Sequence, residues 1–493
     1  MMPTTAFARD QSPKGANLDQ STISKLANYL KGAEKRIGGS NTLAVEVRDA
    51  FSSEVLFKRN STLKLIPASV AKLFTSVLAL KVLGGSYRFP LEVFSDSKPG
   101  LSQRKGGGIG NVGNLYVRGY GDPTLVDERI WFVAKTLKEQ GVREVQDLVL
   151  DDTLFVNARG PQGYRAYDAG LGALTVNHNS YAVHVAPASS GSKAIVSVTP
   201  GAPLRIKNQV RTVAGSKVKI QISQNPKSAS FSPRLTASSN AKYKKLSIDP
   251  VDVVVSGSIG EYAKVKTIYR SAPAPTFYFA GIFRAALENA GIRVKGDILV
   301  GETSGNAELL RSFESRELAL ILRELNQYSN NITAGQILFL LGQDSNGYFR
   351  QDIGLKRIEG LLGSLGDFES RLYDGSGLDR KSRVSVETIN KLLVHAANDL
   401  SVGPELISSL SRYKRSGTLK RRKFGDESQK SYDRVGKLWG KTGTLTGVSS
   451  LAGYLQLQSG RQVAYSIIVN GRLAKADATV IERRIAEILL GES

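Results

Sequence analysis

The stretch that decides the fold is Ile66–Thr75, which reads IPASVAKLFT and opens the most apolar helix candidate of the chain. Proline just before the start and serine at the first position are typical signals of a helix N-terminus. In the SxxK motif from Ser69 to Lys72, residues three apart share one helix face, so the lysine amine is expected beside the serine hydroxyl. The free amides and positive end of the helix would lie near the same hydroxyl. This arrangement predicts a nucleophilic serine.

A lysine could serve as the base for this serine without any histidine. Burial and nearby cations lower the pKa of a lysine amine, which then accepts a proton near neutral pH. SxxK alone is a weak motif, because a capped core helix with a solvated lysine gives the same pattern. The pattern also occurs at Ser61, Ser95, Ser102, Ser190, Ser216, Ser239 and Ser411. Only Ser69 opens a strongly apolar helix.

A second motif, Ser329-Asn330-Asn331, opens the helical stretch that begins at Ile332. Its hydroxyl suits a proton relay, and its amide suits a substrate peptide carbonyl. SxN is also weak alone, since it recurs at 223–225, 238–240 and 304–306.

A third motif, Lys441-Thr442-Gly443-Thr444, occurs once and leads into the last two predicted strands. Its ammonium and hydroxyls suit a carboxylate, and its glycine lets a ligand approach the backbone. The amides of Ser69 and Thr444 could form an oxyanion hole. The order SxxK, SxN, KTG is the set described for β-lactamases and penicillin-binding proteins.

Composition narrows the chemistry further. The 493 residues predict two or three domains. The chain has no cysteine, which excludes disulfides, thiolate catalysis and zinc–cysteine sites. None of His178, His184 and His395 stands in a metal-ligand spacing. If the chain is an enzyme, we therefore expect a base that is not histidine, and we expect no metal or other cofactor.

The formal net charge of +23 indicates an anionic partner or a long-range attraction. The basic residues are spread along the chain without a nucleic-acid-binding signature, so we expect no nucleic-acid partner. The densest cluster is Arg412, Lys414, Arg415, Lys420, Arg421, Arg422 and Lys423. This cluster fits either a peripheral contact with an anionic wall or membrane surface or a solvated loop, and the sequence leaves both open.

The two ends of the chain carry matching elements. The hydrophobic pattern near the N-terminus predicts a helix over 18–30 and a hairpin over 43–47 and 54–57. The pattern near the C-terminus predicts strands over 451–458 and 462–470 and a helix over 477–490. Between about 87 and 269, short β-branched runs indicate a β-rich insertion. Helices are expected again over 277–290, 315–327, 332–341, 355–362 and 386–398. This order favours one sheet built from both ends of the chain and interrupted by the insertion.

The sequence resembles the class C low-molecular-mass penicillin-binding proteins, the D-alanyl-D-alanine carboxypeptidase/endopeptidase family (peptidase family S13). Besides the three motifs, the resemblance rests on the flanking stretches 66–75, 119–125, 374–378, 417–420 and 440–445. It runs from about residue 20 to the end and is weakest between about 190 and 260.

The resemblance implies an α/β (α+β) fold, in which a serine β-lactamase/transpeptidase-like domain carries a long β-rich insertion. We expect the transpeptidase-like domain at 18–86 plus 270–493 and the inserted domain at 87–176 plus 247–269. A small nested β domain is expected at 177–246.

The resemblance also implies roles for individual residues. Ser69 is the expected nucleophile and Lys72 the base, while Ser329 and Asn331 support proton transfer and substrate positioning. The expected ligands of the substrate's terminal carboxylate are Lys441, Thr442, Gly443 and Thr444. Positions near the substrate's side-chain pocket are Leu378 and Arg380, with Asp151 or Asp152 meeting its free amine.

The implied reaction is cleavage of D-Ala-D-Ala, or of a D-alanyl-diamino-acid cross-link, in peptidoglycan peptides. β-Lactams would be covalent inhibitors. The alternatives are a β-lactamase or esterase on the same fold, and a non-catalytic wall-binding scaffold. We expect a periplasmic or secreted protein, with Ala6-Phe7-Ala8 as the trace of a removed signal peptide.

Overall fold

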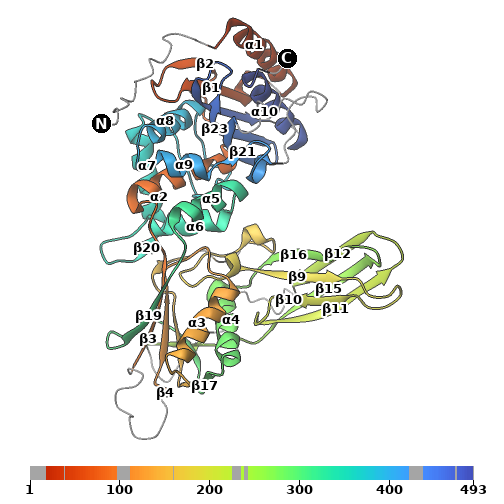
Figure 1. Cartoon of the computed structure of the whole chain (residues 1–493), viewed down its shortest axis with the longest axis vertical. Coiled ribbons are helices and arrows are strands. Elements are labelled where there is room, and N and C mark those ends of the chain that lie inside the picture. Colours follow the sequence, from red (N-terminus) through yellow and green to blue (C-terminus); the bar gives the residue numbers. More distant parts are fainter. Residues whose placement is uncertain are drawn as a thin grey trace, which may run out of the picture.

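The computed structural model describes residues 18–37, 39–96, 111–158, 160, 162–224, 235–237, 242–420, 437–471 and 475–491. Ala6-Phe7-Ala8 and part of the basic cluster, 421–423, lie outside these ranges. Two domains follow each other along the long axis, and a β module projects sideways from the lower one (Figure 1). We call the upper one, which contains Ser69 and both ends of the described chain, the SxxK domain.

The SxxK domain is built on a six-stranded sheet in the order β2-β1-β24-β23-β22-β21. Its strands are β1 (Leu43–Asp49), β2 (Val55–Arg59), β21 (Ser411–Arg412), β22 (Leu438–Leu445), β23 (Val448–Gln456) and β24 (Gln462–Asn470). β1 pairs antiparallel with β24 along its whole length. The two ends of the chain therefore share one sheet, as the sequence predicts.

Helices cover both faces of this sheet. On one face, α1 (Gln20–Ile37) and α10 (Lys475–Leu489) pack together against the strands. On the other face lies α8 (Val386–Ala397). Beyond it are α2 (Lys72–Leu83), α5 (Leu318–Tyr328), α6 (Asn331–Leu340), α7 (Gln351–Ser364) and α9 (Gly403–Ser409). α2 is the core of this group, since every residue from Lys72 to Leu80 is buried.

The inserted domain has a seven-stranded sheet in the order β13-β14-β18-β7-β5-β3-β19. Its strands are β3 (Pro90–Ser95), β5 (Leu115–Gly119), β7 (Leu148–Asp151), β13 (Leu235–Ala237), β14 (Lys244–Leu246), β18 (Ile298–Val300) and β19 (Glu308–Glu314). Two helices in contact with each other, α3 (Asp127–Glu139) and α4 (Pro275–Asn289), belong to the same apolar core. A small sheet of β17 (Arg293–Val294), β6 (Glu144–Val145) and β4 (Asn111–Val112) adjoins them.

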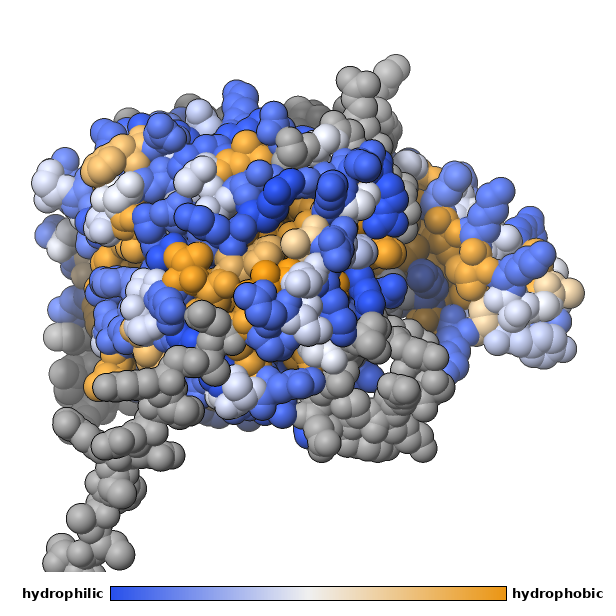
Figure 2. Space-filling view, turned by 90° about the horizontal axis from the view of Figure 1, so that it is seen from above, coloured by the Kyte–Doolittle hydropathy of each residue, from blue (hydrophilic) through white to orange (hydrophobic). Residues whose placement is uncertain are grey.

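The projecting module consists of two three-stranded sheets, β10-β9-β16 and β11-β15-β12. Its strands are β9 (Ser180–Ala186), β10 (Ile195–Val198), β11 (Leu204–Val213), β12 (Val218–Gln224), β15 (Val251–Gly260) and β16 (Lys266–Ser271). Seen along the long axis, the module stands out beside a largely hydrophilic face on which hydrophobic side chains gather near the middle (Figure 2).

The segment borders differ from those expected. The chain does not return to the SxxK domain at 270, because α4 lies in the core of the inserted domain and β19 pairs with β3. β14 pairs with β18 in the large sheet, whereas β15 and β16 belong to the module. Pairings between strands far apart in sequence set these borders, and local hydrophobic patterns do not record them. We propose that the inserted domain extends to about residue 314.

Candidate functional site

Ser69 lies in the 3₁₀ turn Ala68–Ala71, which continues directly into α2. The turn is held by a close approach of two backbones. Ala68 has φ 48° and Gly377 has φ 78°, and a Cβ on Gly377 would lie 1.9 Å from the Ala68 carbonyl oxygen. Only glycine fits there. The DGSG turn at 374–377 therefore helps to set the position of the serine.

Lys72 lies one turn after Ser69, and its side chain is fully buried. Its Nζ is 2.9 Å from Ser69 Oγ, 2.7 Å from Asn331 Oδ1 and 2.6 Å from the Ser376 carbonyl oxygen. Burial lowers the pKa of Lys72 to about 7, against a smaller opposing effect of Asp374. A large share of the amine is thus unprotonated at neutral pH, as a general base requires.

The acceptor carbonyl of Ser376 belongs to a rigid turn. The Asp374 carboxylate accepts hydrogen bonds from the amides of Ser376, at 3.1 Å, and Asp379, at 2.9 Å. Thr75 Oγ1, on α2, donates to the Gly375 carbonyl at 2.8 Å. The contact between Lys72 and the Ser376 carbonyl was not predicted from the sequence, because a backbone carbonyl has no sequence signature.

The SxN motif forms the tight corner between α5 and α6. Ser329 ends α5 with φ 59°, and the Asn330 side chain caps α6 by accepting from the amides of Ile332 and Thr333. The side chains on either side of Asn330, those of Ser329 and Asn331, belong to the site. Ser329 Oγ accepts from Lys441 Nζ at 2.8 Å, while Asn331 contacts Lys72. Each serine of the site thus has a buried lysine beside it.

The KTG motif lies within β22, next to the Ser69 turn. A Cβ on Gly443 would lie 2.8 Å from the Ser69 nitrogen and 2.9 Å from the Pro67 carbonyl oxygen, so glycine is required for this approach. Thr442 Oγ1 donates to Thr418 Oγ1 at 2.8 Å. Thr418 lies in the 417–420 stretch and is a neighbour to which the sequence assigned no role. Thr444 is half-buried on the same strand.

The residues expected near the side-chain pocket are less closely tied to this centre. Leu378 is half-buried and Arg380 is exposed. Asp151 is completely buried, where it accepts from Arg118 Nε at 3.0 Å and from both the amide and the hydroxyl of Thr303. Burial raises the pKa of Asp151, but hydrogen bonds from Thr153, Thr303 and Arg118 outweigh it and hold the pKa below its usual value. Its oxygens are occupied within the fold.

Asp152 is only half-buried, and its carboxylate accepts from the Thr276 hydroxyl. Burial raises the pKa of Asp152. Of the two adjacent aspartates, Asp152 is therefore the one whose carboxylate has acceptor capacity left.

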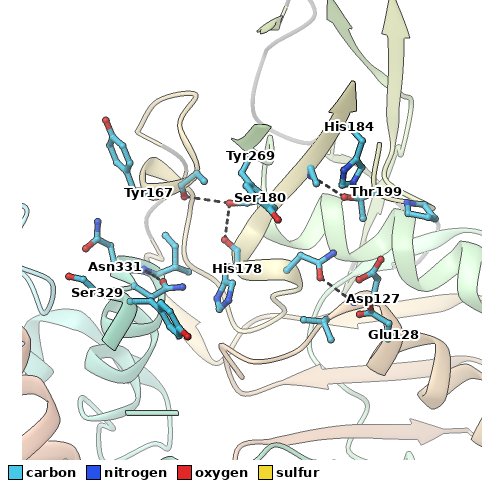
Figure 3. A pocket seen from close by; sticks show the side chains of 18 residues that line it. Asp127, Glu128, Tyr167, His178, Ser180, His184, Thr199, Tyr269, Ser329 and Asn331 are labelled. Carbon is cyan, nitrogen blue, oxygen red and sulfur yellow. Dashed lines mark hydrogen bonds between the residues drawn. The ribbon is translucent and has the colours of Figure 1, made fainter. Parts of the chain in front are cut away.

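A cavity of about 640 Å³ opens beside the SxN corner. Ser329 and Asn331 line one side, and Asp127 and Glu128 of α3 line the other, with His178 between them (Figure 3). The cavity thus lies where the SxxK domain faces the inserted domain and its module.

Within the described ranges, no group of three or more histidine or acidic side chains is placed to hold a metal ion. Within the same ranges, no helix combines the length and the apolar character that a membrane crossing requires.

Comparisons with known proteins show which family and which relatives this chain resembles. The model of the D-Ala-D-Ala carboxypeptidase 3 (S13) family matches residues 23–490. A D-alanyl-D-alanine carboxypeptidase of Actinomadura sp. (strain R39) is 32% identical over an alignment of 467 residues that covers 90% of this chain and 81% of that protein. The carboxypeptidase DacB of Haemophilus influenzae is 26% identical over an alignment of 442 residues that covers 85% of this chain and 83% of DacB.

Solved structures show the same fold. The crystal structure of penicillin binding protein 4 (dacB) from Haemophilus influenzae matches with a TM-score of 0.72 at 21% identity, covering 94% of this chain and 99% of that one. A second structure of that protein, complexed with a β-lactam, matches with a TM-score of 0.68 at 20% identity, covering 93% and 98%.

Proposed function

Because this chain belongs to the D-Ala-D-Ala carboxypeptidase 3 (S13) family, we propose that it is a serine D,D-peptidase of bacterial peptidoglycan that acts through an acyl-enzyme on Ser69. The observation that carries the proposal is the buried Lys72 amine, 2.9 Å from Ser69 Oγ, with its pKa lowered by burial to about 7. This amine supplies the base that the three histidines do not.

In the acylation step, Ser69 Oγ attacks the carbonyl carbon between two D-alanines while its proton passes to Lys72 Nζ. The amides of Ser69 and Thr444 hold the oxygen that becomes negative. The C–N bond then breaks, and the departing amine takes up a proton. Ser329 Oγ, which accepts a hydrogen bond from Lys441 Nζ at 2.8 Å, is the proposed relay for that proton. In deacylation, water gives a proton to Lys72 and its oxygen bonds to the acyl carbon. The bond between the acyl carbon and Ser69 Oγ then breaks, and Lys72 returns the proton to Ser69 Oγ.

The substrate's terminal carboxylate would lie along β22. Lys441 supplies the positive charge, and the hydroxyls of Thr442 and Thr444 supply donors. Thr418 supports this group through its 2.8 Å contact with Thr442. A carboxyl-terminal D-alanine as leaving group gives carboxypeptidase action, and the amine of a cross-linked diamino acid gives endopeptidase action.

For the free amine of the substrate's side chain we propose Asp152, because the oxygens of Asp151 are already saturated by Arg118, Thr153 and Thr303. Leu378 and Arg380 would line the same pocket. The substrate is an extracytoplasmic polymer, so we place the enzyme in the periplasm or outside the cell.

The experiment that tests this function is product analysis with purified muropeptides. The wild type should release D-alanine from a pentapeptide, split D-alanyl-diamino-acid cross-links, or do both, and Ser69→Ala should do neither. Undiminished cleavage by Ser69→Ala would contradict the proposal. Rapid turnover of penicillin without any peptide cleavage would identify a β-lactamase instead.

A further inference from the structure

The cavity at the SxN corner is part of a longer groove. A second cavity, of about 260 Å³, shares Asp127, Glu128 and Pro200 with it and continues along α3 and α4. We call the two together the interdomain groove. It leads away from Ser329 and Asn331, so it can hold a part of the substrate that is remote from the scissile bond.

Exposed aromatic rings line this groove. The exposed fractions are 73% for Tyr328, 59% for Tyr269, 46% for Tyr167 and 51% for Trp131. The four rings come from α5, β16, the 3₁₀ turn Ala166–Asp168 and α3. Aromatic side chains are normally among the main apolar groups that a fold buries. Exposed rings gathered along one groove therefore indicate a ligand that covers them.

The groove also contains an unpartnered polar atom on an unusual backbone. His178 Nδ1 is buried without a hydrogen-bond partner in the described structure. Asn177, His178 and Asn179 have φ values of 52°, 52° and 51° in succession. Such conformations persist only where the surroundings enforce them, and they gather at functional sites. Here the side chain of Asn179 is anchored on the Gly170 carbonyl at 2.8 Å.

The acidic pair limits what the groove accepts. Asp127 and Glu128 line both cavities and form the first turn of α3. These side chains would repel the terminal carboxylate of a wall peptide, and the free amine of that peptide's side chain is proposed above to lie at Asp152. A neutral ligand rich in hydroxyl and amide groups can instead donate to the carboxylates and stack on the rings.

We propose that the interdomain groove binds the glycan strand to which the substrate peptide is attached, as a chain of N-acetylated amino sugars stacked on the exposed rings. The inference rests on the proposed function, since it assumes that the peptide reaches the SxN corner from a wall polymer. The carboxylates of Asp127 and Glu128 then accept hydrogen bonds from sugar hydroxyls and acetamido groups. The enzyme would recognise glycan-linked peptides better than free ones.

Kinetics on paired substrates tests this proposal. We would compare a free pentapeptide with the same peptide linked to a β-1,4 tetrasaccharide of N-acetylated amino sugars. The wild type should show about tenfold higher kcat/KM for the linked substrate, through a lower KM. Tyr269→Ala and Trp131→Ala should each remove about three- to tenfold of this preference without changing kcat/KM for the free peptide. Tyr262→Ala is the matched control, because this ring is 78% exposed and lines neither cavity.

Equal kcat/KM for the two substrates in the wild type would overturn the inference, as would a preference that survives in both ring variants. A binding titration keeps the test independent of the peptidase reaction. Peptide-free N-acetylglucosamine tetrasaccharide should bind wild type and Ser69→Ala equally, and Tyr269→Ala more weakly. If the tetrasaccharide bound none of the three proteins, the proposal that the groove binds glycan would be overturned. If both peptides were left uncleaved while sugar binding stayed intact, only the proposed function would be contradicted.

Discussion

Two fully buried charged residues, Lys72 in the SxxK domain and Asp151 in the inserted domain, have opposite surroundings. Asp151 has a cation, Arg118, and hydrogen-bond donors on both oxygens, so its charge is compensated. Within the described ranges, Lys72 Nζ hydrogen-bonds to the neutral oxygens of Ser69, Asn331 and Ser376, and the charge of Asp374 affects its pKa less than burial does. The pKa shifts follow this difference. Burial without a paired charge lowers the pKa of Lys72 to about 7, whereas hydrogen bonds keep the pKa of Asp151 low.

Burial alone therefore does not distinguish a charged side chain that stabilises the fold from one that is reactive. A compensated charge stays ionised and holds the fold together. An uncompensated amine loses its proton near neutral pH and becomes a base.

The largest effect is expected for Lys72→Met. Loss of the base should lower the rate of Ser69 acylation by a penicillin by about a thousandfold, within the range of general-base catalysis. The apolar replacement avoids burying a charge, so the thermal unfolding midpoint should shift by only a few degrees. Lys81→Met, an exposed lysine on the same helix, is the control. An acylation rate of Lys72→Met within tenfold of the wild type would contradict the role of this amine as the base.

For Asp151→Ala we expect a large loss of stability and a small change in the acylation rate. Arg118 and the donors of Thr153 and Thr303 lose their acceptor, which should lower the free energy of unfolding by about 2–4 kcal/mol. The acylation rate of the folded protein should stay within about twofold. Urea denaturation and acylation kinetics measure the two effects. Asp152→Asn, which keeps an acceptor for Thr276, should change stability by under about 1 kcal/mol.

The pH dependence of acylation gives a third comparison. Since the folded pKa of Lys72 is lowered to about 7, the amine is protonated and inactive below that pH. The acylation rate should therefore fall about tenfold per pH unit below 7 and level off above it. Stopped-flow acylation between pH 5 and 9 measures this profile. A rate that still rises tenfold per unit up to pH 9 would show that burial does not lower the pKa of Lys72 as described, and a rate that stays constant down to pH 5 would show that this amine is not the base of the acylation step.

The smallest effect is expected for Thr75→Val. It removes the hydroxyl that fixes the Gly375 carbonyl, and with it one support of the turn that offers the Ser376 carbonyl to Lys72. Loss of one buried hydrogen bond should lower stability by about 1 kcal/mol, with an acylation rate within about fivefold. Denaturation and acylation kinetics on this variant check both values. A rate loss as large as that of Lys72→Met would mean that the turn, and not the amine, controls reactivity.

Much of the fold was predictable from sequence where the signal is local. The amphipathic helices, the terminal strands and the contact between Ser69 and Lys72 follow from hydrophobic period and spacing. The course of the insertion could not be predicted from local sequence patterns, because β19 pairs with β3, which lies more than 200 residues away in the sequence. The choice between Asp151 and Asp152 also needed the structure, since only the position of Arg118 and Thr303 shows which carboxylate is satisfied.

The most direct test of the central claim is intact-mass analysis after incubation with a penicillin, for the wild type and for Ser69→Ala. The acyl-enzyme account predicts a wild-type mass increased by one penicillin, and no such adduct on Ser69→Ala. An unmodified wild type beside intact penicillin would contradict the account, as would an adduct of the same size on Ser69→Ala.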